Sequence, residues 1–190
     1  MELQEIELKI KDPKDGVFAI SLVESPAIEE DFVKLNSHQV ELKVIDEEKR
    51  LLVGFALVPE KRIYRRMKGK EFNIYFTKET VNHAAELYMT QMNQNNWTLE
   101  HSRPTEGVSV VQSWVVEDPS NDKSNLYKLD PKGGEWVIMT KVYNDQVWQQ
   151  VKDGKYKGFS IEGMFDGFEQ LQSKDEAVIE ELKRLLSEQI

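Results

Sequence analysis

Ser160 is the side chain in this sequence that is best placed to act as a nucleophile. It lies in the run Lys155–Phe165, between Gly158 and Gly163. In a strand, side chains alternate between two faces, so this run has an apolar face and a mixed face. The apolar face holds Phe159, Ile161 and Phe165, and the mixed face holds Ser160, Glu162 and Met164. Strand glycines leave room for another backbone, such as a peptide substrate, although a strand serine often simply faces water.

Histidine is the second residue type that could support such chemistry, and the chain has three. His38 lies in a polar segment, and His83 falls off the apolar stripe of a predicted helix. A predicted strand over 97–101 places His101 on the same face as Trp97 and Leu99, and so among packed apolar side chains. A histidine with a purely structural role is the alternative interpretation. The spacing of the three does not indicate a metal site.

Carboxylates cluster in the turn-rich loop 117–124. Asp118 and Asp122 could bind a cation or orient a base there. Short side-chain bonds to the neighbouring backbone, as in Asx turns, explain them equally well. No glycine-rich phosphate loop, His-Glu-x-x-His motif or internal repeat is present, so we expect no cofactor.

The composition excludes several classes of partner. The chain has 190 residues, 39% hydrophobic and 31% charged, as in a globular domain. Its formal net charge of −9 argues against general binding to nucleic acid or anionic membranes. The longest apolar run, 51–58, is too short to cross a bilayer, and the basic run 61–68 is expected to be a solvated loop. The absence of cysteine excludes disulfides and thiolate chemistry, and the acidic start lacks the features of a signal peptide.

The predicted elements are mostly strands. Alternating or apolar runs predict them at 2–10, 17–23, 40–45, 51–58, 72–76, 97–101, 108–116, 136–142 and 155–165. Turns are expected at 12–16 and 103–107, and a short helix or loop at 27–35. The pattern predicts an α+β domain with a β-rich, barrel-like sheet and a few helices.

Three helices are predicted from caps and apolar stripes. Thr77 caps a helix whose stripe is Val81, Ala84, Ala85, Tyr88 and Met92. Asn144 caps a short helix that ends before Gly154. A capping box at 173–176 opens an amphipathic helix over 173–190. We expect residues 1–170 to form the domain, and this helix to dock a partner or to link the domain to a further segment.

Four motifs together resemble a known family. They are His101-Ser-Arg-Pro-x-x-Gly107, the Glu117–Ser124 loop, Gly134–Val142 and Lys152–Gly163. The set is similar to the XkdF-like phage serine proteases, relatives of tailed-phage prohead maturation proteases and, more distantly, of herpesvirus assemblins. The likeness extends from about Val17 to Phe165 and is specific as a set, whereas each motif alone is weak.

The resemblance implies roles for two residues. By motif, Ser160 corresponds to the nucleophile and His101 to the general base, which removes the hydroxyl proton. The family's third, acidic residue begins a strand located after the nucleophile. Here the matching text lies at 19–27, with Ala19 at the acid position, an order that implies a circular permutation. Either another acid orients His101, or the site is a dyad, or this copy is inactive. The candidate acids are Glu24, Asp118, Asp122 and Glu162.

The function implied by the resemblance is a serine endopeptidase of phage head maturation. Its partners would be scaffold and major capsid proteins or a second copy of itself, inside a prohead in the bacterial cytoplasm. The main alternative is an inactive capsid- or scaffold-associated module on the same fold. A third possibility is a binding adaptor that uses the 173–190 helix and needs no chemistry.

Overall fold

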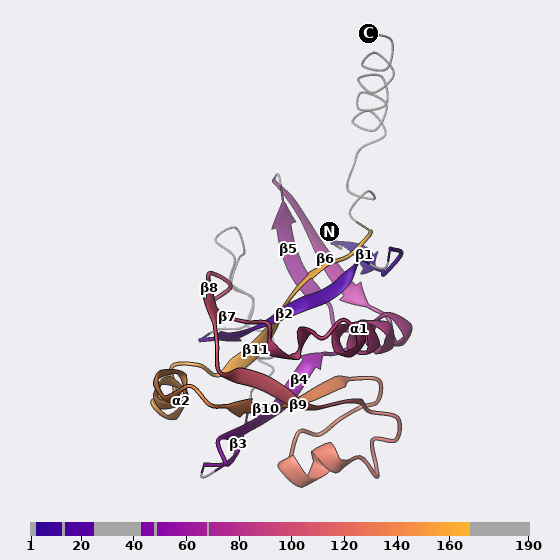
Figure 1. Ribbon diagram of the computed structural model, residues 1–190. Helices are drawn as coiled ribbons and strands as arrows, with labels where there is room; N and C mark the ends of the chain where they lie inside the picture. Colours follow the sequence, from indigo (N-terminus) through magenta and orange to yellow (C-terminus); the bar gives the residue numbers. More distant parts are fainter. Residues whose placement is uncertain (1–2, 13, 25–42, 48, 68, 168–190) are drawn as a thin grey trace.

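The chain folds into eleven strands and two α-helices in the part that the structure describes. This computed structural model describes residues 3–12, 14–24, 43–47, 49–67 and 69–167 (Figure 1). The strands are β1 (Gln4–Leu8), β2 (Gly16–Val23), β3 (Lys43–Asp46), β4 (Leu51–Leu57), β5 (Ile63–Met67), β6 (Lys70–Phe76), β7 (Trp97–Leu99), β8 (Arg103–Thr105), β9 (Val108–Val115), β10 (Trp136–Val142) and β11 (Gly158–Met164). The helices are α1 (Lys78–Thr90) and α2 (Asp145–Lys152), with short 3-10 helices η1 (Asn93–Asn95) and η2 (Lys123–Tyr127). The content is that of the expected β-rich α+β protein.

The strands form three separate sheets. Their orders are β1-β6-β5, β3-β4-β10-β9 and β11-β2-β7-β8. We call the last of these the site sheet. No closed barrel forms within the described ranges, so the expected barrel-like sheet is replaced by three short open ones. Three or four twisted strands are too few to close on themselves, and the sheets instead share one core.

The core lies where α1 packs against β2, β9 and β10. Tyr88 of α1 meets Trp136 of β10 edge to face, with ring centroids 5.2 Å apart. On the other side of the core, Trp97 of β7 meets Phe159 of β11 at 5.8 Å. Such pairs add about 0.5–1.5 kcal/mol each to the burial of their rings. The aromatic pairs therefore tie the site sheet and the β10 sheet to one apolar interior.

The two helix starts follow the sequence signals. The Thr77 hydroxyl accepts the Thr80 N–H, and the Asn144 side chain accepts two N–H groups at the start of α2. Gly154, just past α2, has a φ of +71°. Four members of the predicted α1 stripe are buried, but Met92 is 79% exposed because the helix ends at Thr90.

Two expected loops are strands. The basic run 61–68 contains β5, and the expected turn at 103–107 contains β8. Both are edge strands, which tolerate charges and proline because one of their sides needs no partner. The strands predicted at 40–45 and 51–58 correspond to β3 and β4, which pair antiparallel as a hairpin. The predicted segment 27–35 and the helix 173–190 lie outside the described residues. No described helix is long and apolar enough to cross a membrane.

Candidate active site

β11 carries Ser160 on its mixed face, as the alternation predicted. Phe159 is buried in the core and Ile161 packs against it, whereas Ser160 and Glu162 are half-buried on the opposite side. Among the described residues, the Ser160 hydroxyl has no hydrogen-bond partner. Its neighbour across the strand pair is Ser21 of β2. The hydroxyl is therefore uncommitted and faces the same side of the site sheet as Glu162 and Ser21.

Gly163 makes room for a neighbouring strand and not, as expected, for the backbone of a substrate. The β2–β11 pair has a bulge between Glu162 and Gly163, and a Cβ on Gly163 would lie 2.5 Å from the Gly16 carbonyl oxygen. The backbone that requires glycine here is thus β2 itself and not a substrate. The bulge ends the regular alternation, so Ser160 and Glu162 are the last two mixed-face positions before the strand is distorted.

His101 lies in a tight turn and not at the end of a strand. β7 ends at Leu99, and the next two residues, Glu100 and His101, have φ values of +53° and +52°. The Ser102 N–H closes the turn on the Leu99 carbonyl at 3.2 Å. Positive φ at both central positions is the type I′ pattern, which favours glycine or asparagine. The expectation that His101 shares the face of Trp97 and Leu99 is wrong, because the turn directs its ring to the mixed face.

The strained turn is held by the central strand. The Glu100 N–H donates to the Leu22 carbonyl at 3.1 Å, and the His101 N–H donates to the Ser21 hydroxyl at 3.0 Å. Ser21 is fully buried, and its own proton points to the Thr98 carbonyl at 3.3 Å or the Leu22 carbonyl at 3.4 Å. A non-glycine residue with positive φ costs about 1–2 kcal/mol, so contacts of this kind are needed to maintain it.

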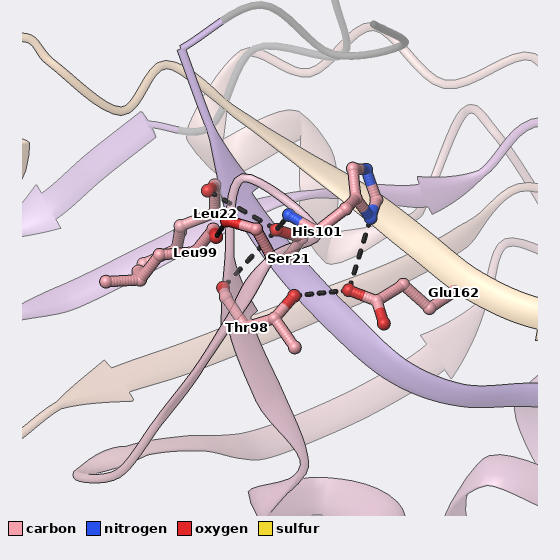
Figure 2. A network of polar contacts seen from close by, with 7 residues as sticks. Ser21, Leu22, Thr98, Leu99, His101 and Glu162 are labelled. Atoms are coloured by element: carbon pink, nitrogen blue, oxygen red, sulfur yellow. Dashed lines mark hydrogen bonds and ion pairs between the residues drawn. The ribbon is translucent and has the colours of Figure 1, made fainter. Parts of the chain in front are cut away.

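Glu162 is the acid that contacts the His101 ring among the described residues. Its Oε1 lies 3.2 Å from His101 Nδ1, and the Thr98 hydroxyl donates to the same oxygen (Figure 2). The two side chains are about one-quarter exposed, at 24% for His101 and 21% for Glu162. The contact joins β11 to the turn after β7 across β2. An imidazole nitrogen, a carboxylate and a serine hydroxyl thus share one face of one sheet.

The candidate acids of the 117–124 loop lie elsewhere. Figure 1 shows that loop and η2 at the lower edge of the molecule, away from β7 and β8. The Asp118 carboxylate accepts the Ser120 N–H at 3.0 Å and the Asn121 side chain at 2.6 Å. The Asn121 and Ser120 hydrogen bonds lower the pKa of Asp118. This carboxylate is satisfied by its own loop, in agreement with the Asx-turn interpretation.

Asp122 is equally occupied. Its Oδ1 accepts the Ser124 N–H at 2.7 Å, at the start of η2, and the Trp114 indole N–H at 3.1 Å. Partial burial opposes ionisation, but these hydrogen bonds and the neighbouring Lys123 outweigh it and lower the pKa of Asp122. Asp122 therefore stabilises the loop and does not reach His101.

Glu24 meets the turn only through its backbone. The Glu24 N–H donates to the Glu100 carboxylate at 2.7 Å. Of the four candidate acids, the structure thus brings Glu162 to His101 and leaves the other three apart. No hydrogen bond joins Ser160 to His101 in the described residues. Catalytic hydrogen bonds of this kind are often long or poorly aligned in substrate-free enzymes. No group of three or more metal-ligating side chains gathers within the described ranges.

Sequence reasoning missed Ser21 and Thr98. Both are hydroxyl residues in otherwise apolar strands, β2 and β7, which pair in parallel so that Ser21 lies beside Thr98. The one local signal is that Ser21 has apolar residues on both sides in the run 17–23. A hydroxyl buried in such a strand needs a hydrogen-bond partner. The identity of that partner is a long-range property that the sequence pattern does not contain.

Comparison with protein families identifies the class of protein to which this chain belongs. A family model of phage serine proteases matches residues 39–169, which include β7, the His101 turn and β11. The chain belongs to this family, described as "Putative phage serine protease XkdF". No curated protein and no solved structure shows a significant match. The matched segment begins after β2, so the family model covers Ser160, His101 and Glu162 but not Ser21.

Proposed function

We propose that this chain is a serine endopeptidase in which Ser160 is the nucleophile, His101 the general base and Glu162 the residue that orients the base. The contact between Glu162 Oε1 and His101 Nδ1, beside an uncommitted serine on the same sheet face, carries this proposal. Membership in a phage serine protease family supports it.

The chemistry follows from the hydrogen bond to Glu162. A carboxylate only accepts hydrogen bonds, so it favours the neutral His101 tautomer with the proton on Nδ1. The lone pair is then on Nε2, which can take the proton of the Ser160 hydroxyl as that oxygen attacks a peptide carbonyl. The resulting imidazolium is stabilised by the same carboxylate, and its proton passes to the leaving amine.

The position of Glu162 accounts for the missing acid at residue 19. The resemblance to prohead proteases places an acid at the position of Ala19, and Ala19 is the direct cross-strand neighbour of Glu162. Side chains directly opposite in an antiparallel pair share a face, with Cβ atoms about 4.5–5.5 Å apart. A glutamate on β11 can therefore supply a carboxylate to the region that an acid on β2 would reach.

The biological role that we propose is processing of phage head proteins during assembly, with scaffold or coat proteins, or the chain itself, as substrates. The family resemblance alone supports this assignment. The test is to co-express the chain with the scaffold and coat proteins that are encoded beside it, and to map new termini in these proteins by mass spectrometry. Cleavage that depends on Ser160 supports the role, and unchanged partner proteins would contradict it.

The nucleophile itself is tested with a fluorophosphonate probe. Covalent labelling of the wild-type chain at Ser160, lost in Ser160→Ala, is the expected result. A second candidate function, an inactive head-associated module, is favoured by one observation, that no hydrogen bond joins Ser160 to His101 in the described residues. Absence of labelling, both alone and with assembling head proteins, would favour the module.

A further inference from the structure

Four residues from three segments, β2, β7 with its following turn, and β11, form a closed ring of polar contacts (Figure 2). The His101 N–H donates to the Ser21 hydroxyl, and the Ser21 hydroxyl donates to the Thr98 carbonyl. The Thr98 hydroxyl donates to Glu162 Oε1, which contacts the His101 ring. We infer that Ser21 and Thr98 are positioning residues that fix His101 and Glu162 for proton transfer. The inference rests on the proposed function, because it assigns its two residues to that site.

Thr98 determines where the Glu162 carboxylate sits. A glutamate side chain has three rotatable bonds and loses considerable rotamer freedom when it is held in place. Thr98 is half-buried in β7 on the same face of the site sheet, and its β-branched side chain has few rotamers of its own. Its single hydroxyl proton must go to the carboxylate, since a carboxylate cannot donate. Oε1 is therefore held at one point, within reach of His101 Nδ1.

Ser21 determines where the His101 backbone sits. Its hydroxyl has one proton, which a carbonyl takes, so a lone pair remains for the His101 N–H at 3.0 Å. Ser21 is fully buried, so water does not replace a lost bond easily. His101 has a positive φ, and without this bond its turn has less to hold it in that conformation.

The two contacts act on opposite ends of His101. Ser21 holds the backbone nitrogen, and Thr98 acts on the ring through Glu162. A general base must be held within a fraction of an ångström of its working position, and a displacement of about 1 Å can cost a hundredfold in rate. The ring of contacts therefore accounts for how a partly exposed histidine in a strained turn is kept in one orientation.

The test replaces Thr98 in the full-length chain. Thr98→Val keeps the shape and removes the donor, whereas Thr98→Ser keeps the donor. We expect Thr98→Val to slow labelling or cleavage by about tenfold to a hundredfold. The loss should fall on the maximal rate and not on KM, and Thr98→Ser should restore most of the activity. Thr105→Val, at a half-buried threonine on the edge strand β8 of the same sheet, is the matched control and should change little.

A second readout does not depend on activity. The ¹⁵N chemical shifts of the His101 ring report which nitrogen carries the proton, and His101→Ala assigns the signals among the three histidines. We expect Nδ1 to be protonated in the wild type and in Thr98→Ser, and a mixture of tautomers in Thr98→Val. Ser21→Ala should shift the His101 backbone amide signal and broaden the ring signals.

The possible results distinguish a failure of the proposed protease function from a failure of the positioning roles of Ser21 and Thr98. If the wild type is not labelled at Ser160, the proposed function fails, and the tautomer measurement still decides whether Thr98 positions Glu162. If Thr98→Val keeps the wild-type tautomer and rate, Thr98 has no positioning role and the inference is overturned. If Thr98→Val and Thr105→Val lose activity equally, the effect is a general one on the sheet and the inference is likewise overturned.

Discussion

The turn around His101 and the loop 117–124 differ in how their polar groups are satisfied. In the loop, Asp118 and Asp122 accept hydrogen bonds from neighbours a few residues away, apart from the Trp114 indole. In the turn, Glu100 and His101 have positive φ, and their N–H groups are bound by β2, from a distant part of the sequence. The loop is held mainly by residues close to it in the sequence, whereas the turn is held by a distant strand of the sheet.

That difference distinguishes a carboxylate that stabilises its own loop from a carboxylate that is placed to orient a histidine ring. Asp122 Oδ1 accepts a backbone and an indole N–H; partial burial opposes ionisation, but these donors and Lys123 outweigh it and lower the pKa of Asp122. Glu162 shares one oxygen between Thr98 and the His101 ring, at a site formed by three strands. Under the proposed function, the acid bound within its own loop is structural, and the acid that contacts a histidine ring across strands orients the base.

The largest expected effect comes from Ser160→Ala. Deleting the nucleophile removes the covalent route and should reduce the rate a thousandfold or more. The hydroxyl has no partner among the described residues, so the free energy of unfolding should change by about 1 kcal/mol or less. Urea unfolding and product mass spectrometry measure the two quantities. The control, Ser120→Ala in the loop, should leave both unchanged, and normal processing by Ser160→Ala would refute the protease proposal.

His101→Ala should also abolish processing, because no other described base contacts Glu162. The matched variant is His83→Ala, on the exposed side of α1, which should keep near-normal activity. Rates are compared in the same cleavage assay, with circular dichroism to check that both variants fold. The reverse result, activity lost in His83→Ala and kept in His101→Ala, would show that the wrong histidine has been assigned.

Glu162→Gln should have the next largest effect, about a hundredfold to ten-thousandfold on the maximal rate. An amide group can donate to His101 Nδ1 and so favour the tautomer with the proton on Nε2, which cannot take the serine proton. Asp122→Asn is the comparison, and we expect no change in rate. Equal losses in the two variants would remove the distinction between the acid of the site and the acid of the loop.

Asp122→Ala should produce the smallest effect, and only on stability. Loss of a helix-capping acceptor costs about 1 kcal/mol, with no change in cleavage rate. The pKa of Asp122 is lowered in the folded state, so its stabilisation is present above the ordinary aspartate pKa and is lost as the pH falls through the folded-state value. Urea unfolding between pH 7 and pH 3 should therefore show the wild type losing its advantage only in the acidic range. An advantage that grows in acid would contradict this.

The sequence predicted the features that depend on near neighbours. Caps at Thr77 and Asn144, the apolar stripe of α1 and the two faces of β11 all follow from local spacing. Edge strands were harder, because β5 is rich in charge and β8 contains Pro104, which are features of loops as well as of edges.

The arrangement of the site could be predicted only in part. Ser160, His101 and Glu162 were all among the candidates, but the sequence offered no way to choose Glu162 over Asp118 or Asp122. That choice depends on β2 pairing antiparallel with β11 and parallel with β7, which no local pattern encodes. The ring of His101 was placed on the wrong face because the turn has neither glycine nor asparagine, the residues that usually mark two positive φ values.

The order of the strands in the site sheet has a consequence for synthesis. β2 is synthesised before the segment that carries His101, and β11 is the last of the described strands, yet they lie side by side with Ser160 opposite Ser21. The segment that carries His101 emerges between them. A nascent chain that stops before β11 therefore has His101 and its backbone anchor, Ser21, but lacks both Ser160 and Glu162. Translation itself thus delays the assembly of the site until nearly all of the described chain has been made.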